Sequence, residues 1–161
     1  GADLAARLFA DVIDPSEPVT IIGGAYADVE MLKATYGLKD VRWHNPPMNL
    51  KQKPAAVVRA ASFAARQDSR FTFICVGVPQ QEMVAYAIAE HGGARGVGLC
   101  VGAGLDFLTG KAARAPMWLR SCGLEWLHRL MHEPARLWRR YLVDGPKVFS
   151  LFAAWRASMA A

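Results

Sequence analysis

The stretch Val19-Thr20-Ile21-Ile22-Gly23-Gly24 decides the fold. Four consecutive β-branched residues are typical of a buried strand, and a glycine pair permits a tight turn from strand to helix. A helix-like segment continues to about Tyr36, and Val41-Arg42-Trp43-His44 then forms a second predicted strand, which Asn45-Pro46-Pro47 ends. Strand, helix and strand in this order predict a βαβ unit and therefore a parallel sheet.

The same alternation extends in both directions from this unit. Helical spacing is found over residues 3–13, 55–66 and 80–90, and strands are predicted over 71–76 and 96–101. Residues 1–110 are therefore expected to form an α/β core, a Rossmann-like, doubly wound parallel sheet with flanking helices. Residues 111–161 are expected to form a helical appendage of three short helices, punctuated by Gly123, Pro134 and Gly145-Pro146.

Charge is distributed unevenly between these two parts. Of the 161 residues, 53% are hydrophobic, enough for one domain with a buried core. Residues 1–110 carry 10 Lys/Arg against 11 Asp/Glu, whereas residues 111–161 carry 9 against 3. Cys75, Cys100 and Cys122 show no paired spacing and are expected to be reduced, buried thiols. Because no apolar run reaches about 18 residues and no signal peptide is evident, any membrane contact is expected to be peripheral.

Arginine and tryptophan alternate at helical spacing in the appendage. Leu137, Trp138, Tyr141 and Leu142 share one helix face, and a second apolar stripe comprises Val148, Phe152, Trp155 and Met159. Two interpretations remain open. The stripes pack onto the sheet and leave the arginines solvated, or the surface meets phosphate groups or membrane headgroups.

Ligands of doubly wound sheets bind beyond the carboxyl ends of the strands, so the four loops there carry the predicted site. Three of them contain glycines that let backbone N–H groups approach phosphate, which favours a nucleotide diphosphate. Taken singly, Gly23-Gly24 and Gly102-Ala103-Gly104 are better explained as ordinary strand-to-helix turns, because neither fits a phosphate-binding motif. The loops are Gly23-Gly24, His44-Asn45-Pro46-Pro47, Gly77-Val78-Pro79-Gln80-Gln81-Glu82 and Gly102-Ala103-Gly104-Leu105-Asp106.

Four polar side chains in these loops have both a structural and a functional interpretation. Gln81 is a plausible hydrogen-bonding group for a ligand, whereas Glu82 fits a first-turn acid that complements the helix dipole. Asp106 either stabilises a helix start or accepts hydrogen bonds from a sugar. His44 is more simply structural than a general base. A metal site and nucleophilic hydrolysis are not expected, since the chain lacks the corresponding motifs.

Four motifs taken together resemble the WecG/TagA/CpsF glycosyltransferases, family 26. The resemblance covers nearly the whole chain and implies an inverting, metal-independent transfer without a cofactor. By the same resemblance, an N-acetylhexosamine-type sugar would pass from a UDP-sugar donor to a polyprenyl-diphosphate-linked acceptor, at the inner face of the cell membrane, in bacterial surface polysaccharide synthesis. The motifs are Gly77-x-Pro79-x-Gln81-Glu82, Gly102-Ala103-x-x-Asp106-Phe107-x-x-Gly110, Arg114-Ala115-Pro116-x-Trp118 and Leu124-Glu125-Trp126-Leu127-x-Arg129-Leu130-x-x-Glu133-Pro134-x-Arg136-Leu137-x-x-Arg140-Tyr141.

Two departures from the family pattern affect the predicted chemistry. Gln80 stands where family members usually have Lys, which removes one cation from the nucleotide loop. Family members also begin upstream of Gly1-Ala2-Asp3-Leu4, and the aspartate proposed as their general base lies in that upstream part. The resemblance therefore implies that this chain is a fragment, and Asp106 is the substitute candidate for the base.

The leading hypothesis is thus a peripheral membrane glycosyltransferase with a cytoplasmic, nucleotide-sugar-binding core. The rival hypothesis is a non-catalytic module that binds nucleotide sugar or lipid diphosphate, or self-associates as a homo-oligomer. Nucleic acid is not an expected partner, because the basic charge is interleaved with large apolar residues. The predicted substrate-binding residues are Gly23, Gly24, His44, Gly77, Pro79, Gln81, Glu82, Gly102, Gly104, Asp106 and Arg114, with Gln81 and Asp106 catalytic. The predicted surface for the anionic membrane and the acceptor diphosphate comprises Arg129, Arg136, Arg139, Arg140, Trp138 and Trp155.

Overall fold

The structure is a computed structural model that describes the whole chain except residues 1, 103, 112–115, 133 and 160–161. The side chains of residues 2, 120, 129, 136 and 140 are also outside the description. The chain divides into two compact units, Gly1–Ala113 and Arg114–Ala161, and each is described by itself. We call the first the α/β unit and the second the appendage.

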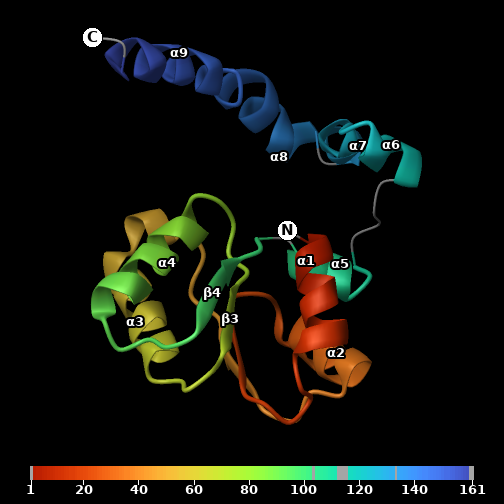
Figure 1. Cartoon of the computed structure of the whole chain (residues 1–161), viewed down its shortest axis with the longest axis vertical. Helices are drawn as coiled ribbons and strands as arrows, with labels where there is room; N and C mark the ends of the chain where they lie inside the picture. Colours follow the sequence, from red (N-terminus) through yellow and green to blue (C-terminus); the bar gives the residue numbers. More distant parts are fainter. Residues whose placement is uncertain (1, 103, 112–115, 133, 160–161) are drawn as a thin grey trace. The chain divides into compact units, whose positions relative to one another are not determined.

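A four-stranded, all-parallel sheet forms the centre of the α/β unit (Figure 1). Its strands are β1 (Val19–Ile22), β2 (Val41–His44), β3 (Phe71–Ile74) and β4 (Val97–Cys100), in the order β2-β1-β3-β4. Val19 is in register with Val41 on one side and with Phe71 on the other. The Rossmann-like α/β fold expected from the sequence is therefore confirmed, and β1 spans the residues predicted for it.

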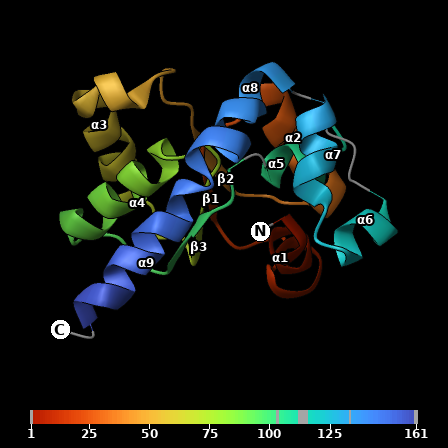
Figure 2. The ribbon, with the colours of Figure 1, turned by 90° about the horizontal axis from the view of Figure 1, so that it is seen from above.

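Helices cover both faces of this sheet. On one face lie α3 (Pro54–Ala65) and α4 (Gln80–His91), and on the other lie α1 (Ala2–Arg7), α2 (Tyr26–Tyr36) and α5 (Gly104–Leu108) (Figures 1 and 2). A π-helical turn, Leu8–Val12, extends α1, and a 3-10 turn, Leu50–Gln52, precedes α3.

The side chains of β1 alternate between two hydrophobic cores, as a strand buried on both faces requires. Val19 and Ile21 belong to the core under α1, α2 and α5, whereas Ile22 belongs to the core under α3 and α4. Thr20 points to the second face as well, where its hydroxyl forms a buried 2.8 Å hydrogen bond with Ser69. All four residues of β1 are buried, which explains the unbroken apolar run in the sequence.

β4 lies at an edge of the sheet, and this position corrects the prediction that all three cysteines are buried. Cys100, at the end of β4, is exposed, and so is Cys122 in the appendage. Cys75 follows β3 and packs, partly buried, against the first core. An apolar strand pattern does not distinguish an edge strand from a central one, which is why the sequence missed the difference.

The appendage contains four helices in its described part, one more than the sequence predicted. They are α6 (Met117–Ser121), α7 (Glu125–His132), α8 (Pro134–Trp138) and α9 (Lys147–Met159), with a π-helical turn, Arg139–Asp144, after α8. Gly123 adopts a left-handed φ of +71° and separates α6 from α7. Leu137 is buried, and the ring of Trp126 makes an edge contact with Tyr141 at a centroid distance of 6.1 Å.

Candidate functional site: the crevice beyond β1 and β3

The strand order places a topological switch point between β1 and β3. From β1 the chain crosses through α2 to β2 on one side, and from β2 it crosses through α3 to β3 on the other side of β1. The connections beyond the carboxyl ends of β1 and β3 therefore diverge and leave a crevice, the usual ligand position in such sheets. Gly23 and Gly24 follow β1 at this point, and Gly77 follows β3.

Gly23 is the residue that joins the loops at this crevice. Its N–H donates to the carbonyl of His44 at 2.8 Å, and its carbonyl accepts from Trp43 Nε1 at 3.0 Å. A Cβ at this position would lie only 2.8 Å from Val76 Cγ1, and the φ of +93° also favours glycine. The turn after β1 is thus packed against the ends of both neighbouring strands. The structure brings the predicted residues Gly23 and His44 together.

Gln81 lies in the first turn of α4 and is almost fully buried, with 7% of its surface exposed. Its Nε2 donates to Glu82 Oε1 at 2.8 Å, so the two predicted polar residues of this loop form a pair. Gln81 Oε1 is buried without a hydrogen-bond partner among the described residues. A Cβ on Gly102 would lie 3.3 Å from this oxygen, which places Gln81 beside the glycine turn after β4.

Asp106 reaches the same region from α5. The adjacent Leu105 is buried, and a Cβ on Gly24 would lie 2.5 Å from Leu105 Cδ2, so this leucine occupies the space that Gly24 leaves open. Burial raises the pKa of the Cys75 thiol to about 12, and the nearby charge of Asp106 adds to the rise. Cys75 also follows Ile74 beside Gly23, so Asp106 lies near the switch point. No hydrogen bond joins the side chains of Gln81 and Asp106, which are both described.

The imidazole of His44 has no hydrogen-bond partner among the residues that the structure describes, and it packs instead on Phe63 with a centroid distance of 5.2 Å. Burial, and secondarily the charge of Arg59, lowers the pKa of His44. A ring held on α3 in this way suits the structural interpretation, and the backbone carbonyl of His44 is the group that contacts the turn after β1. Gly77 and Pro79 are exposed beside the start of α4, and Gly104 is buried at the start of α5.

Sequence reasoning missed three residues that shape this crevice. Gln80, noted only as a departure from the family pattern, accepts a hydrogen bond from the N–H of Leu50 at 2.8 Å and so fixes the connection after β2. Asp28 and Lys111 form an ion pair at 3.1 Å between α2 and the segment after α5. The sequence allows Asp28 to be recognised as an acid in the first turn of a helix, but no neighbouring residue indicates that its partner lies 83 residues away.

Comparison with known protein families agrees with this geometry. A family model for the glycosyl transferase WecG/TagA/CpsF family matches residues 1–161. The chain belongs to this family. The match confirms the resemblance that the four motifs carried, and it supports a glycosyl transfer function. No solved structure matches the chain.

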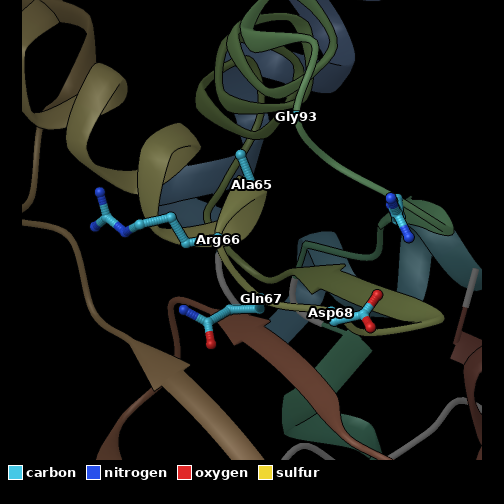
Figure 3. A pocket seen from close by; sticks show the side chains of 6 residues that line it. Ala65, Arg66, Gln67, Asp68 and Gly93 are labelled. Carbon is cyan, nitrogen blue, oxygen red and sulfur yellow. The ribbon is translucent and has the colours of Figure 1, made fainter.

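Other features of this WecG/TagA/CpsF family chain lie outside the crevice. A pocket of about 200 Å³ is lined by Ala65, Arg66, Gln67, Asp68, Gly93 and Arg95 (Figure 3). These residues come from the end of α3 and from the connections that lead into β3 and β4. The pocket is therefore at the amino ends of the strands, opposite the end that carries Gln81 and Gly102, and it is distinct from the predicted nucleotide site.

The structure describes only some of the predicted site residues of the appendage. Arg114 lies outside the described residues, and so do the side chains of Arg129, Arg136 and Arg140. Arg139, Trp138 and Trp155 are exposed. Among the residues that the structure describes, no three His, Cys, Asp or Glu side chains group so that they could hold a metal ion. None of the described helices combines the length and apolar character needed to cross a membrane.

Proposed function

We propose that this chain transfers an N-acetylhexosamine-type sugar from a UDP-sugar to a polyprenyl-diphosphate-linked acceptor, with inversion and without a metal. The reaction would serve bacterial surface polysaccharide synthesis at the cytoplasmic face of the membrane. Membership of the WecG/TagA/CpsF family supports glycosyl transfer. The crevice at the switch point supports a nucleotide-linked donor, because this is the position where doubly wound sheets hold nucleotides.

The observation that carries the proposal is the buried Oε1 of Gln81. A buried acceptor without a partner costs about 1–3 kcal/mol, so an oxygen in this state marks a position for a donor that the described residues do not supply. The hydroxyls of a sugar or ribose and the N–H of uracil are such donors. A Cβ on Gly102 would lie 3.3 Å from this oxygen, so the absence of a side chain at Gly102 keeps the space beside it open.

The charge of the donor diphosphate requires positive groups in place of a metal. The twelve-residue helix α4 begins at Gln80, beside the crevice, where the N–H groups of Gln80 and Gln81 donate to the carbonyl of Gly77. The helix contributes the positive end of its dipole to this region. Arg114 and the other arginines of the appendage are the proposed additional cations. Together these groups would stabilise UDP as it leaves.

In an inverting transfer, the acceptor hydroxyl oxygen forms a bond to C1 of the sugar while the bond from C1 to the UDP oxygen breaks. The hydroxyl proton passes to a general base, and the electron pair of the broken bond stays on UDP. We propose Asp106 as this base, because its charge acts on the thiol of Cys75, the residue that follows β3 at the switch point. Gln81 would orient the donor.

The proposed membrane side is the appendage. Trp138 and Trp155 are exposed together with Phe149 and Phe152, and they stand among a surplus of basic residues. Exposed aromatic and basic side chains together favour binding to anionic lipid. In vesicle flotation, the chain should bind anionic vesicles better than neutral ones, and changing Arg136, Arg139 and Arg140 to Glu should abolish the preference. Equal binding to both kinds of vesicle would contradict this part of the proposal.

A UDP titration followed by a transfer assay tests the proposed function. Gln81→Leu should weaken UDP-sugar binding about tenfold or more, because it removes the buried acceptor, whereas Gln67→Leu, at the opposite end of the sheet, should bind normally. Asp106→Asn should retain binding and lose turnover. Full turnover by Asp106→Asn would overturn its role as the base, and binding without turnover by the unaltered chain would favour the non-catalytic module.

A further inference from the structure

Helix α5, which carries Asp106, is too short to be stable by itself. It comprises five residues, Gly104–Leu108, and an isolated helix of this length does not form in water. Its position therefore depends on tertiary contacts. The first of these is Leu105, which fills the space above Gly24 in the turn after β1.

The second contact is the ion pair between Lys111 and Asp28. Lys111 Nζ lies 3.1 Å from Asp28 Oδ2 and 3.5 Å from Asp28 Oδ1, so the ammonium group donates to both carboxylate oxygens. Asp28 Oδ2 also accepts from the N–H of Ala25 at 3.3 Å, in the same turn that begins with Gly23. The pair therefore ties the segment just after α5 to the turn that borders the crevice.

Burial distinguishes this pair from the ordinary surface pairs of the chain. Asp28 is only 8% exposed. An acid in the first turn of a helix can stabilise that helix without leaving solvent, so helix stabilisation alone does not require this burial. The hydrogen bond to Asp28 raises the pKa of Lys111, and the charge of Asp106 contributes to the same rise. Lys111 therefore lies within the field of both carboxylates.

We propose that Asp28 and Lys111 are positioning residues, which hold α5 and Asp106 closed against the Gly23-Gly24 turn and so set the affinity for the nucleotide sugar. This inference rests on the proposed function. Because Lys111 is largely exposed, the pair contributes little to the global free energy of unfolding. Loss of the pair shifts the balance between a docked and an undocked α5, a local opening that global unfolding does not report.

Cys75 supplies a local readout of this opening. Cys75 is partly buried against the core under α1, α2 and α5, its backbone lies beside Gly23, and the charge of Asp106 acts on its thiol. Thiol reagents attack the thiolate of an accessible cysteine. Undocking of α5 should therefore raise the rate at which Cys75 is labelled. The exposed Cys122 of the appendage, followed in the same sample by mass spectrometry of peptides, serves as the internal reference.

The test compares Lys111→Met, Asp28→Asn and the double variant in UDP affinity, Cys75 labelling and thermal midpoint. Each variant should weaken UDP binding and raise Cys75 labelling about two- to fivefold, the range of a single partly exposed ion pair. The double variant should be no worse than either single one, because both remove the same interaction. Lys111→Arg should restore both values, and the thermal midpoint should stay close to that of the unaltered chain.

Lys33→Met is the matched control, since Lys33 pairs with Glu30 at 2.8 Å on the surface of the same helix α2. It should change neither UDP affinity nor Cys75 labelling. The positioning role alone would be overturned if the unaltered chain and Lys111→Met bound UDP equally well and protected Cys75 equally. An unaltered chain that does not bind UDP would overturn the proposed function, and the positioning role with it.

Discussion

The α/β unit and the appendage use apolar residues in opposite ways. In the α/β unit, apolar side chains of the sheet and its helices are buried in two cores, one on each face. In the described part of the appendage, Leu137 is the one buried hydrophobic residue, whereas Trp118, Phe149, Phe152 and Trp155 are all exposed. Burial therefore accounts for the stability of the first unit, while the second presents its apolar residues as a surface. Similar residue types thus form a core in one unit and an exposed surface in the described part of the other.

The same substitution in the two units measures this difference most directly. Phe73→Ala should lower the free energy of unfolding by about 3–5 kcal/mol, because Phe73 is 1% exposed and its ring stacks on Phe9 at 4.6 Å. Chemical denaturation followed by circular dichroism measures the change.

Phe149→Ala, in α9, is the control for that comparison. Phe149 is 76% exposed, so the change should stay within about 0.5 kcal/mol. Similar losses from both substitutions would mean that the appendage buries its apolar surface in solution as the α/β unit does, and the contrast between the units would fail.

Leu137 tests whether the appendage has a small core of its own. Leu137→Ala should destabilise α8 and its packing on α7 by about 2 kcal/mol, at the low end for a buried leucine because few buried neighbours surround it. Hydrogen exchange of amides in α7 and α8 measures this local loss. Leu142→Ala, at a site that is 57% exposed, should leave the exchange unchanged. Equal protection in both variants would show that Leu137 does not hold these helices together.

The contrast between the units also explains how much of the fold could be predicted. Alternating strands and helices identified the parallel sheet, and the bounds of β1 and β2 were as expected. Burial on both faces imposes a continuous run of β-branched residues on β1, and Asn45-Pro46-Pro47 ends the partly buried β2. The appendage was less predictable. The division at Gly123 was expected, but the number of helices was not, and a sequence pattern cannot tell an apolar face that packs from one that remains exposed.

The candidate site divides in a similar way. Gly23 was found because a tight turn beside two strand ends requires glycine, and Gln81 because a polar residue follows a buried strand. The unpaired state of Gln81 Oε1 and the pairing of Asp28 with Lys111 were not predictable. Both depend on contacts between segments far apart in sequence, and periodicity describes only neighbours along the chain.

The smallest predicted effect is the pH dependence that His44 gives to the stability of the α/β unit. Burial, together with Arg59, lowers the pKa of His44, so the unfolded chain binds a proton more readily at this residue than the folded chain does. The contribution of neutral His44 to stability is therefore present above about pH 6.5, the ordinary range of histidine, and is lost as the pH falls below it.

Between pH 7 and pH 5, His44→Phe, which keeps a ring on Phe63, should lose less stability than the unaltered chain. Arg59→Gln should show an intermediate loss, because it removes the secondary cause, whereas Arg66→Gln, at the end of the same helix, should behave as the unaltered chain. Denaturant unfolding of the α/β unit across this pH range measures the slopes. Identical slopes for the unaltered chain and His44→Phe would show that acid sensitivity does not arise from burial of this imidazole.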